Sequence, residues 1–224
     1  MKKILSLVLI MTVILCGVFI FFEPQMTKAW GPGAGPYSDP VVVTQTVTEE
    51  ISLSEPADIS MSASILGMTG NPGSPTTGSA TWNVKTSNDT GFKLELEAST
   101  DPALQLDASN QFIDYTPAGA VPDYTWTSPT ASQAEFGFSV EAETGADVDD
   151  SFKDATSTCG SGTQSVGHCW RDFTGATKIE IINRSTETDS TGEDEVVKFQ
   201  AESNAKQLSE GSYTATITAT ATMN

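Results

Sequence analysis

The sequence has few basic residues, with 11 Lys and Arg against 29 Asp and Glu. Binding to nucleic acid requires clusters of Lys and Arg that neutralise phosphate charge. The formal net charge of −18 therefore excludes a nucleic-acid partner, and it also argues against adsorption to anionic lipid. Such a chain can be highly soluble, bind a divalent cation, or bind a basic or uncharged partner such as a glycan.

Histidine is nearly absent, because His168 is the only one in the chain. The sequence also lacks a Gly-x-Ser-x-Gly turn, which would present a serine nucleophile to such a base. A glycosidase needs only two carboxylates, but carboxylates are so abundant here that their presence indicates nothing. No set of residues meets the usual criteria for an active site, so we expect a protein that is not an enzyme.

Long apolar runs are missing except at the N-terminus, where Ile4 to Phe22 carries no charge. Lys2 and Lys3 precede this run, and Thr27-Lys28-Ala29 offers small residues at the −3 and −1 positions of a cleavage site. This order is typical of a secretory signal peptide. We therefore predict a signal segment over residues 1–29 and a secreted or cell-surface location.

An uncleaved membrane anchor is the alternative, because the run approaches the roughly 20 residues that span a bilayer. No cluster of Lys or Arg follows it, which favours cleavage. Membrane contact is expected only through this segment, and only if it is retained. Cleavage would remove three basic residues and one acidic residue, leaving 8 against 28 and a formal charge of −20.

Period-two alternation dominates the remaining chain, and an amphipathic helix would not produce it. In Gly211–Thr222, Tyr213 and every second residue after it are apolar, and the residues between them are threonines. Phe92–Ala98, Phe136–Ala142 and Ala80–Val84 alternate in the same way. These stretches predict strands with one face in the core and the other in water.

Further strands are expected near 41–54, 59–65, 177–183 and 195–202, with turn residues between them. This spacing predicts an all-β fold, with residues 41–224 forming a single β-sandwich of jelly-roll or immunoglobulin-like type. Residues 30–40 are rich in Gly and Pro and predict a flexible leader. The stretches 101–129 and 146–173 are interpreted as long loops or insertions.

Cys159 and Cys169 are the only cysteines that remain after cleavage at residue 29. Two thiols in an exported chain, around a short loop rich in Gly and Ser, predict a disulfide that stabilises the fold by roughly 2–3 kcal/mol. A metal site with His168 is the alternative. Adjacent His and Cys are a poor geometry for tetrahedral zinc, which favours the disulfide.

Two acidic clusters are candidates for cation binding. Asp147, Asp149 and Asp150 form the first, and residues 187–195 form the second. Carboxylate oxygens are the ligands that Ca²⁺ prefers, but neither cluster follows the EF-hand pattern. The alternatives are solvated loops and a calcium site; we take Asp147, Asp149 and Asp150 as the candidate ligands. No other cofactor is expected.

Several aromatic residues fall in loop-like stretches, whereas Trp82 lies in a strong strand pattern. The loop aromatics are Trp30, Tyr37, Tyr115, Tyr124, Trp126 and Trp170. Such side chains can stack on sugar rings or anchor a protein partner. Because large aromatics are usually buried, packing over the ends of the sandwich is the favoured interpretation.

A resemblance adds to this picture. It rests on the export signal, the Gly/Pro leader, the strand with Trp82, the turn at 88–91 into Phe92-Lys93-Leu94-Glu95-Leu96, and Gly211–Ile217. Together these resemble bacterial cell-surface β-sandwich proteins of the WxL-like and fimbrial or spore-coat-like kinds. The Trp-x-Leu tripeptide itself is absent, so the resemblance implies a non-catalytic, wall-associated or assembling protein without assigning binding residues.

The sequence therefore predicts an exported structural or assembly protein whose partner is another copy or a cell-envelope component. A carbohydrate- or calcium-dependent adhesion module, with a glycan as partner, is the alternative. Residues 40–54 combine six apolar β-formers with a flexible leader before them. This segment can pair within its own sheet or add to an open sheet edge of a neighbouring subunit, and local pairing has the smaller entropic cost.

Overall fold

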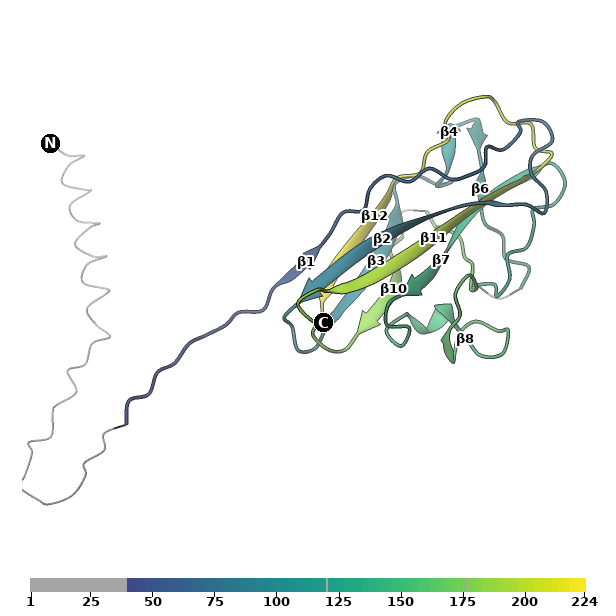
Figure 1. Cartoon of the computed structure of the whole chain (residues 1–224). Helices are drawn as coiled ribbons and strands as arrows, with labels where there is room; N and C mark the ends of the chain where they lie inside the picture. The colour runs from purple at the N-terminus through teal and green to yellow at the C-terminus, as the bar shows by residue number, and fades with distance from the viewer. Residues whose placement is uncertain (1–39, 120, 176) are drawn as a thin grey trace, which may run out of the picture. The chain divides into compact units, whose positions relative to one another are not determined.

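A computed structural model describes residues 40–119, 121–175 and 177–224 (Figure 1). Residues 47–224 form one compact unit. The predicted signal segment, residues 1–29, and residues 30–39 of the leader lie outside the described residues, as do Trp30 and Tyr37. Within the described part, no helix has both the length and the apolar character needed to cross a membrane.

The described elements are almost entirely strands. They are β1 (Ile51–Leu53), β2 (Thr76–Thr86), β3 (Phe92–Ala98), β4 (Gln105–Asp107), β5 (Asn110–Gln111), β6 (Ile113–Asp114), β7 (Gln133–Ala142), the 3-10 helix η1 (Asp150–Phe152), β8 (Lys153–Asp154), β9 (Thr163–Gln164), β10 (Ile179–Arg184), β11 (Glu193–Asn204) and β12 (Ile217–Met223). The prediction of an all-β fold is confirmed.

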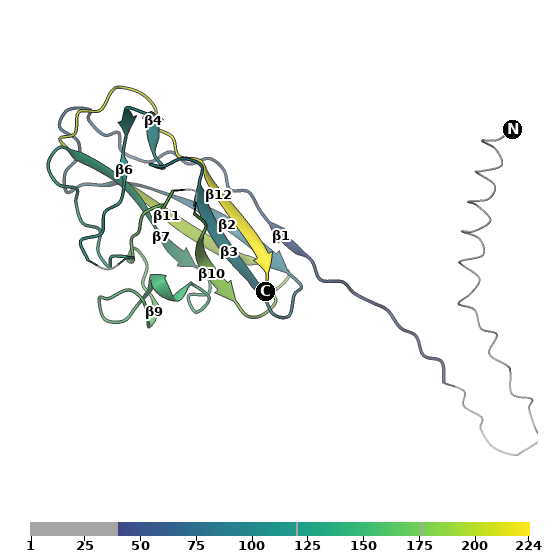
Figure 2. The ribbon, with the colours of Figure 1, turned by 180° about the vertical axis from the view of Figure 1, so that it is seen from behind.

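Two sheets form the body of this unit. The larger has the strand order β1-β2-β11-β7-β6, and the smaller has the order β10-β3-β12. Neighbouring strands are antiparallel except β6 and β7, which are parallel. The turn at 87–91 carries the chain from β2 in the larger sheet to β3 in the smaller one. Figure 2 shows the smaller sheet from its own side, with β12 at its edge.

The predicted turn at residues 88–91 has clear local causes. Asn88 is buried, and its side-chain oxygen accepts hydrogen bonds from the backbone N–H and the hydroxyl of Thr90. Gly91 adopts a φ of +81°, and a Cβ there would lie 2.1 Å from the carbonyl oxygen of Arg184. Only glycine can therefore complete this turn without moving β10.

The core lies between the two sheets, as the alternation predicts. Leu94 and Leu96 are fully buried, whereas Lys93 and Glu95 between them are half-buried on the outer face. The buried predicted core residues are Trp82, Val84, Phe92, Leu94, Leu96, Phe136, Phe138, Val140, Ile179, Ile181 and Phe199. Tyr213 and Ile217 were also expected in the core but are only half-buried. The β-sandwich is confirmed.

Of the strands predicted within the described residues, one is much shorter than expected and another is absent. The strand expected over 41–54 is reduced to Ile51–Leu53, because β1 finds partners only at Thr86 to Val84, where β2 ends. The strand expected over 59–65 is replaced by a single bridge between Ser62 and Thr77. Met61 and Ile65 of this segment still pack against the core.

The strand expected over 211–222 begins later, at Ile217. Alternating exposure does continue backward to Tyr213, but Thr214 bridges Gln105 of β4 rather than a residue of β3. The two long insertions hold the short elements: β4, β5 and β6 lie in 101–129, and η1, β8 and β9 lie in 146–173.

Candidate functional site

The predicted bridge between Cys159 and Cys169 is confirmed. Their sulfurs are bonded and their Cα atoms lie 5.7 Å apart, within the usual range for a disulfide. Cys169 is buried, and its N–H donates to the carbonyl oxygen of Tyr124. The bridge closes a loop within the 146–173 insertion, and the hydrogen bond from Cys169 connects that loop to the 101–129 insertion. Both thiols are used by the bridge rather than by a metal.

His168 has a packing contact beside this bridge. Its ring stacks on the ring of Tyr124, with centroids 4.1 Å apart and planes within 4° of each other. Its Nδ1 lies 3.1 Å from the carbonyl oxygen of Tyr124. The contacts of His168 thus help to hold the two insertions together.

The three aspartates of the candidate calcium site bind three separate protein partners. Asp147 pairs with Arg184 at 2.7 Å, and Asp150 pairs with Lys153 at 2.8 Å. Asp149 caps η1 by accepting a hydrogen bond from the N–H of Ser151 at 3.0 Å. The structure therefore does not bring the three carboxylates onto one point. Among the described residues no group of His, Cys, Asp or Glu is arranged to hold a metal ion, and calcium binding stays a prediction.

Arg184 is the centre of a larger charged cluster at the end of the sandwich. Besides Asp147 it binds Glu193 at 3.0 Å. Glu195 lies next to this cluster on the core face of β11, with only 2% of its surface exposed, and its Oε2 has no hydrogen-bond partner. Burial, reinforced by the charges of Glu193 and Asp147, raises the pKa of Glu195 to about 8.

The sequence interpretation missed Glu195, although a signal was present. Glu195, Val197 and Phe199 are alternate residues of β11, so their side chains lie on the same face of the strand and all three are buried. Glu202 was missed as well. It is fully buried opposite Glu135 of β7, and burial together with the charge of Glu202 raises the pKa of Glu135.

Tyr115, Trp126 and Trp170 form a small cluster on the outer face of the larger sheet. Tyr115 and Trp126 stack with centroids 4.3 Å apart, and Trp170 meets Trp126 edge-on at 5.5 Å. The indole N–H of Trp126 donates to Glu202 at 2.7 Å. Gly137 lies beneath, where a Cβ would stand 2.7 Å from the Cβ of Tyr115. These rings are therefore packed against the sheet and against one another.

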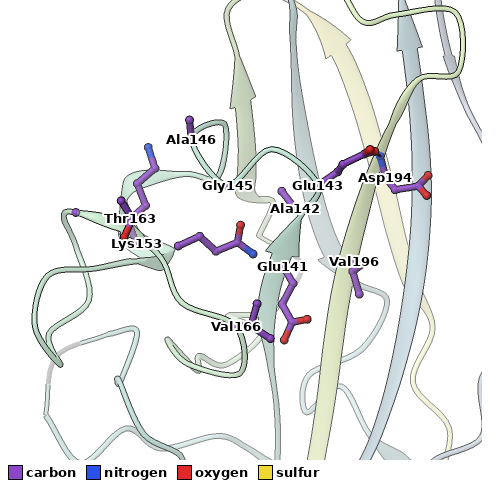
Figure 3. Close-up of a pocket in the computed structure, with 12 residues that line it drawn as sticks. Glu141, Ala142, Glu143, Gly145, Ala146, Lys153, Thr163, Val166, Asp194 and Val196 are labelled. Atoms are coloured by element: carbon purple, nitrogen blue, oxygen red, sulfur yellow. Dashed lines mark hydrogen bonds between the residues drawn. The ribbon is translucent and has the colours of Figure 1, made fainter.

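A hollow of about 760 Å³ lies beside the β8–β9 hairpin (Figure 3). It is lined by Glu141, Ala142, Glu143, Gly145, Ala146, Lys153, Gly162, Thr163, Gln164, Val166, Asp194 and Val196. Glu141 pairs with Lys198 at 2.9 Å, and Asp194 accepts a hydrogen bond from the side-chain amide of Asn83 at 2.8 Å. The hollow is acidic, but these two carboxylates already have protein partners.

A second opening lies where the edges of the two sheets meet. Residues 51–53 of β1 and residues 219–221 of β12 line a slot of about 280 Å³, which we call the edge groove. Both strands are edge strands of their sheets, and Figures 1 and 2 show them beside each other. The edge groove therefore gives access to the margin between the two layers of the sandwich.

The alternation of hydrogen bonds between β12 and β3 shows which backbone groups of β12 point toward the free edge. Ser99 N–H donates to the Thr216 carbonyl, and Asn224 N–H donates to the Gly91 carbonyl. Bonded pairs alternate in an antiparallel ladder, so the even residues of β12 bond to β3. The odd residues, Ile217, Ala219, Ala221 and Met223, direct their N–H and C=O groups to the free edge.

The strand β12 lacks the features that usually prevent an edge strand from pairing with another molecule. Its seven residues, ITATATM, include no charged residue and no proline, and its register with β3 is continuous. Natural edge strands are usually shielded by charges, prolines or bulges, because an open edge pairs readily with another strand. Ala219 and Ala221 are small and half-buried, and with Leu53 they line the edge groove.

The chain matches no protein-family model, and comparisons with curated proteins and with solved structures give no match either.

Proposed function

We propose that this protein is an exported, non-catalytic structural protein, secreted or held at the cell surface, that assembles through the free edge of β12. The observation that carries the proposal is the unprotected, uncharged ladder of Ile217, Ala219 and Ala221 beside the edge groove. Main-chain hydrogen bonds to such an edge supply affinity, and side chains entering a neighbouring groove supply specificity.

Two further features support this role. Disulfides such as Cys159–Cys169 form and persist in oxidising compartments, which suits an extracellular protein. The four loop aromatics within the described residues, and His168, have packing partners of their own, so they contribute to the stability of the insertions. An open sheet edge favours assembly, whereas exposed aromatics along one face would have favoured glycan binding.

The test removes a single backbone N–H from the free edge. Ala221→Pro deletes a donor that β3 does not use, so the fold should be retained, as is usual for proline on an edge strand. Ala221→Ser is the matched control, because it changes the same side chain but keeps the N–H. Light scattering should find oligomers for the unmodified protein and for Ala221→Ser, and monomers for Ala221→Pro.

Two results would reject the proposal. The unmodified protein could remain monomeric across the whole accessible concentration range, or folded Ala221→Pro could assemble as the unmodified protein does. Melting curves of both variants establish that the comparison is made between folded molecules.

Adhesion to a saccharide is the second candidate, and the hollow beside the β8–β9 hairpin favours it. Glu143 places a carboxylate along its wall, a group of the kind that binds sugar hydroxyls. Binding of an oligosaccharide that is lost in Glu143→Gln, with the oligomeric state unchanged, would support this role over assembly.

A further inference from the structure

The segment before β1 is apolar and uncovered, although it consists of good strand formers. Val41, Val42, Val43 and Val47 are 84–88% exposed, and residues 41–47 form no strand. Exposed β-branched residues in series are a liability in a protein that remains alone, because they pair readily with open edges. We call residues 41–47 (VVVTQTV) the donor segment.

The donor segment has the pattern of a strand that covers a groove. In an extended conformation Val41, Val43 and Val47 share one face, interrupted only by Gln45, while Val42, Thr44 and Thr46 share the other. Its length of seven residues equals that of β12. Its valines are larger than Ala219 and Ala221, which line the edge groove.

We infer that the donor segment of one copy adds as a strand to the free edge of β12 in a second copy, with Val41 and Val43 entering the edge groove. This inference rests on the proposed function and names its partner. The new ladder would use the N–H and C=O groups of the odd residues of β12, which β3 leaves free.

For the donor segment to pair with β12 of its own chain, the chain would have to reverse direction before β1, and the sequence there provides no turn. Only Thr48, Glu49 and Glu50 separate Val47 from β1, and none of these is a residue that favours a tight hairpin turn. Glu50 is also fixed, because its N–H donates to the Ser87 hydroxyl and its carbonyl accepts from Ser87 N–H. An extended exit toward another molecule needs no such reversal.

Charge also selects this contact among the surfaces of the molecule. Two copies, each with a formal charge of −18, repel each other. Neither the donor segment nor β12 contains a charged residue, so the proposed contact between them is uncharged on both sides. Because the donating and accepting surfaces differ, one-way donation produces rings or open filaments, whereas reciprocal exchange between two copies closes a dimer.

The first experiment changes one face of the donor segment at a time. Val41→Ser with Val43→Ser removes the two valines that enter the groove, and Val42→Ser with Thr44→Ser is the matched control on the opposite face. Loss of two buried valines should weaken association by about 100-fold or more, as measured by light scattering against concentration. The control pair should associate nearly as the unmodified protein does.

The second experiment distinguishes exchange from return to the same chain. One variant carries Val43→Cys, and its partners carry Ala219→Cys, Ala221→Cys or Met223→Cys, so that neighbouring registers are all sampled. Under oxidation, mixtures should give a covalent dimer of unlike chains. A variant with both Val43→Cys and Ala221→Cys should form cross-links between chains at high concentration and none within a chain at high dilution.

Each failure has a distinct meaning. If the unmodified protein is monomeric, the proposed function and this inference both fail. If it assembles, but the Val41/Val43 variant assembles equally well, the inference fails and the proposed function stands. Cross-links within single chains at high dilution, or no mixed dimer in any of the three registers, would also overturn the inference.

Discussion

Glu195 is the residue that most clearly departs from a simple sandwich core. Its carboxyl group lies inside the end of the sandwich, with a pKa raised to about 8, chiefly by burial. In the unfolded chain its pKa returns to about 4.5. Between these values the folded state holds a proton that the unfolded state has lost, so the free energy of unfolding decreases as pH rises.

We predict that the protein is more stable near pH 5 than near pH 8, and that Glu195→Gln removes most of this difference. The contribution of Glu195 should be fully present below about pH 4.5 and lost as pH rises through about 8, amounting to a few kcal/mol. Asp114, whose pKa burial raises to about 6, adds a smaller effect of the same sign. Urea denaturation at a series of pH values measures it.

The control for this prediction is Glu187→Gln, which neutralises an exposed glutamate and should retain the slope of the unmodified protein. The account of Glu195 is contradicted if Glu195→Gln lowers stability at pH 8, or if it leaves the dependence on pH unchanged.

At the scale of the element, alternation predicted the central strands well. Period two is a local property of the sequence, and burial on one face converts it directly into strand register, as in Phe92, Leu94 and Leu96. The same rule would have placed Glu195 inside, next to Val197, had it been applied to charged residues as well as apolar ones. The disulfide could be predicted because two cysteines allow only one bridge.

The edge strands could not be predicted in this way. The alternation of residues 213–222 is the same for a central strand and for an edge strand, and only the order of strands in the sheet distinguishes them. The short length of β1 has a similar cause, because β2 ends at Thr86, the partner of Ile51. The edge groove depends on both facts, so it became visible only in the folded chain.

The three candidate calcium ligands illustrate another limit. Asp147, Asp149 and Asp150 are close in sequence, but a turn with a cap at Asp149 directs their carboxylates to different partners. Proximity in sequence does not determine convergence in space, because convergence depends on local backbone angles and on distant cations such as Arg184.

At the scale of the whole molecule, the negative net charge opposes assembly, whereas the contact between the donor segment and β12 is uncharged. Added salt should therefore promote association by screening the repulsion between copies, without weakening the contact at β12. We predict that the association constant measured by sedimentation increases as NaCl rises from about 10 mM to about 150 mM, where the Debye length shortens from about 30 Å to about 8 Å. A decrease over this range would indicate a joint held by ion pairs and would contradict the assigned surface.

The most direct test of assembly through β12 is amide hydrogen exchange along that strand. In dilute, monomeric protein the N–H groups of Ala219 and Ala221 should exchange rapidly, while those of Thr218 and Thr220 are protected by β3. In concentrated, assembled protein we predict that Ala219 and Ala221 become protected as strongly as their neighbours. If the protein assembles and these two amides still exchange as fast as in the monomer, the free edge of β12 is not the joint.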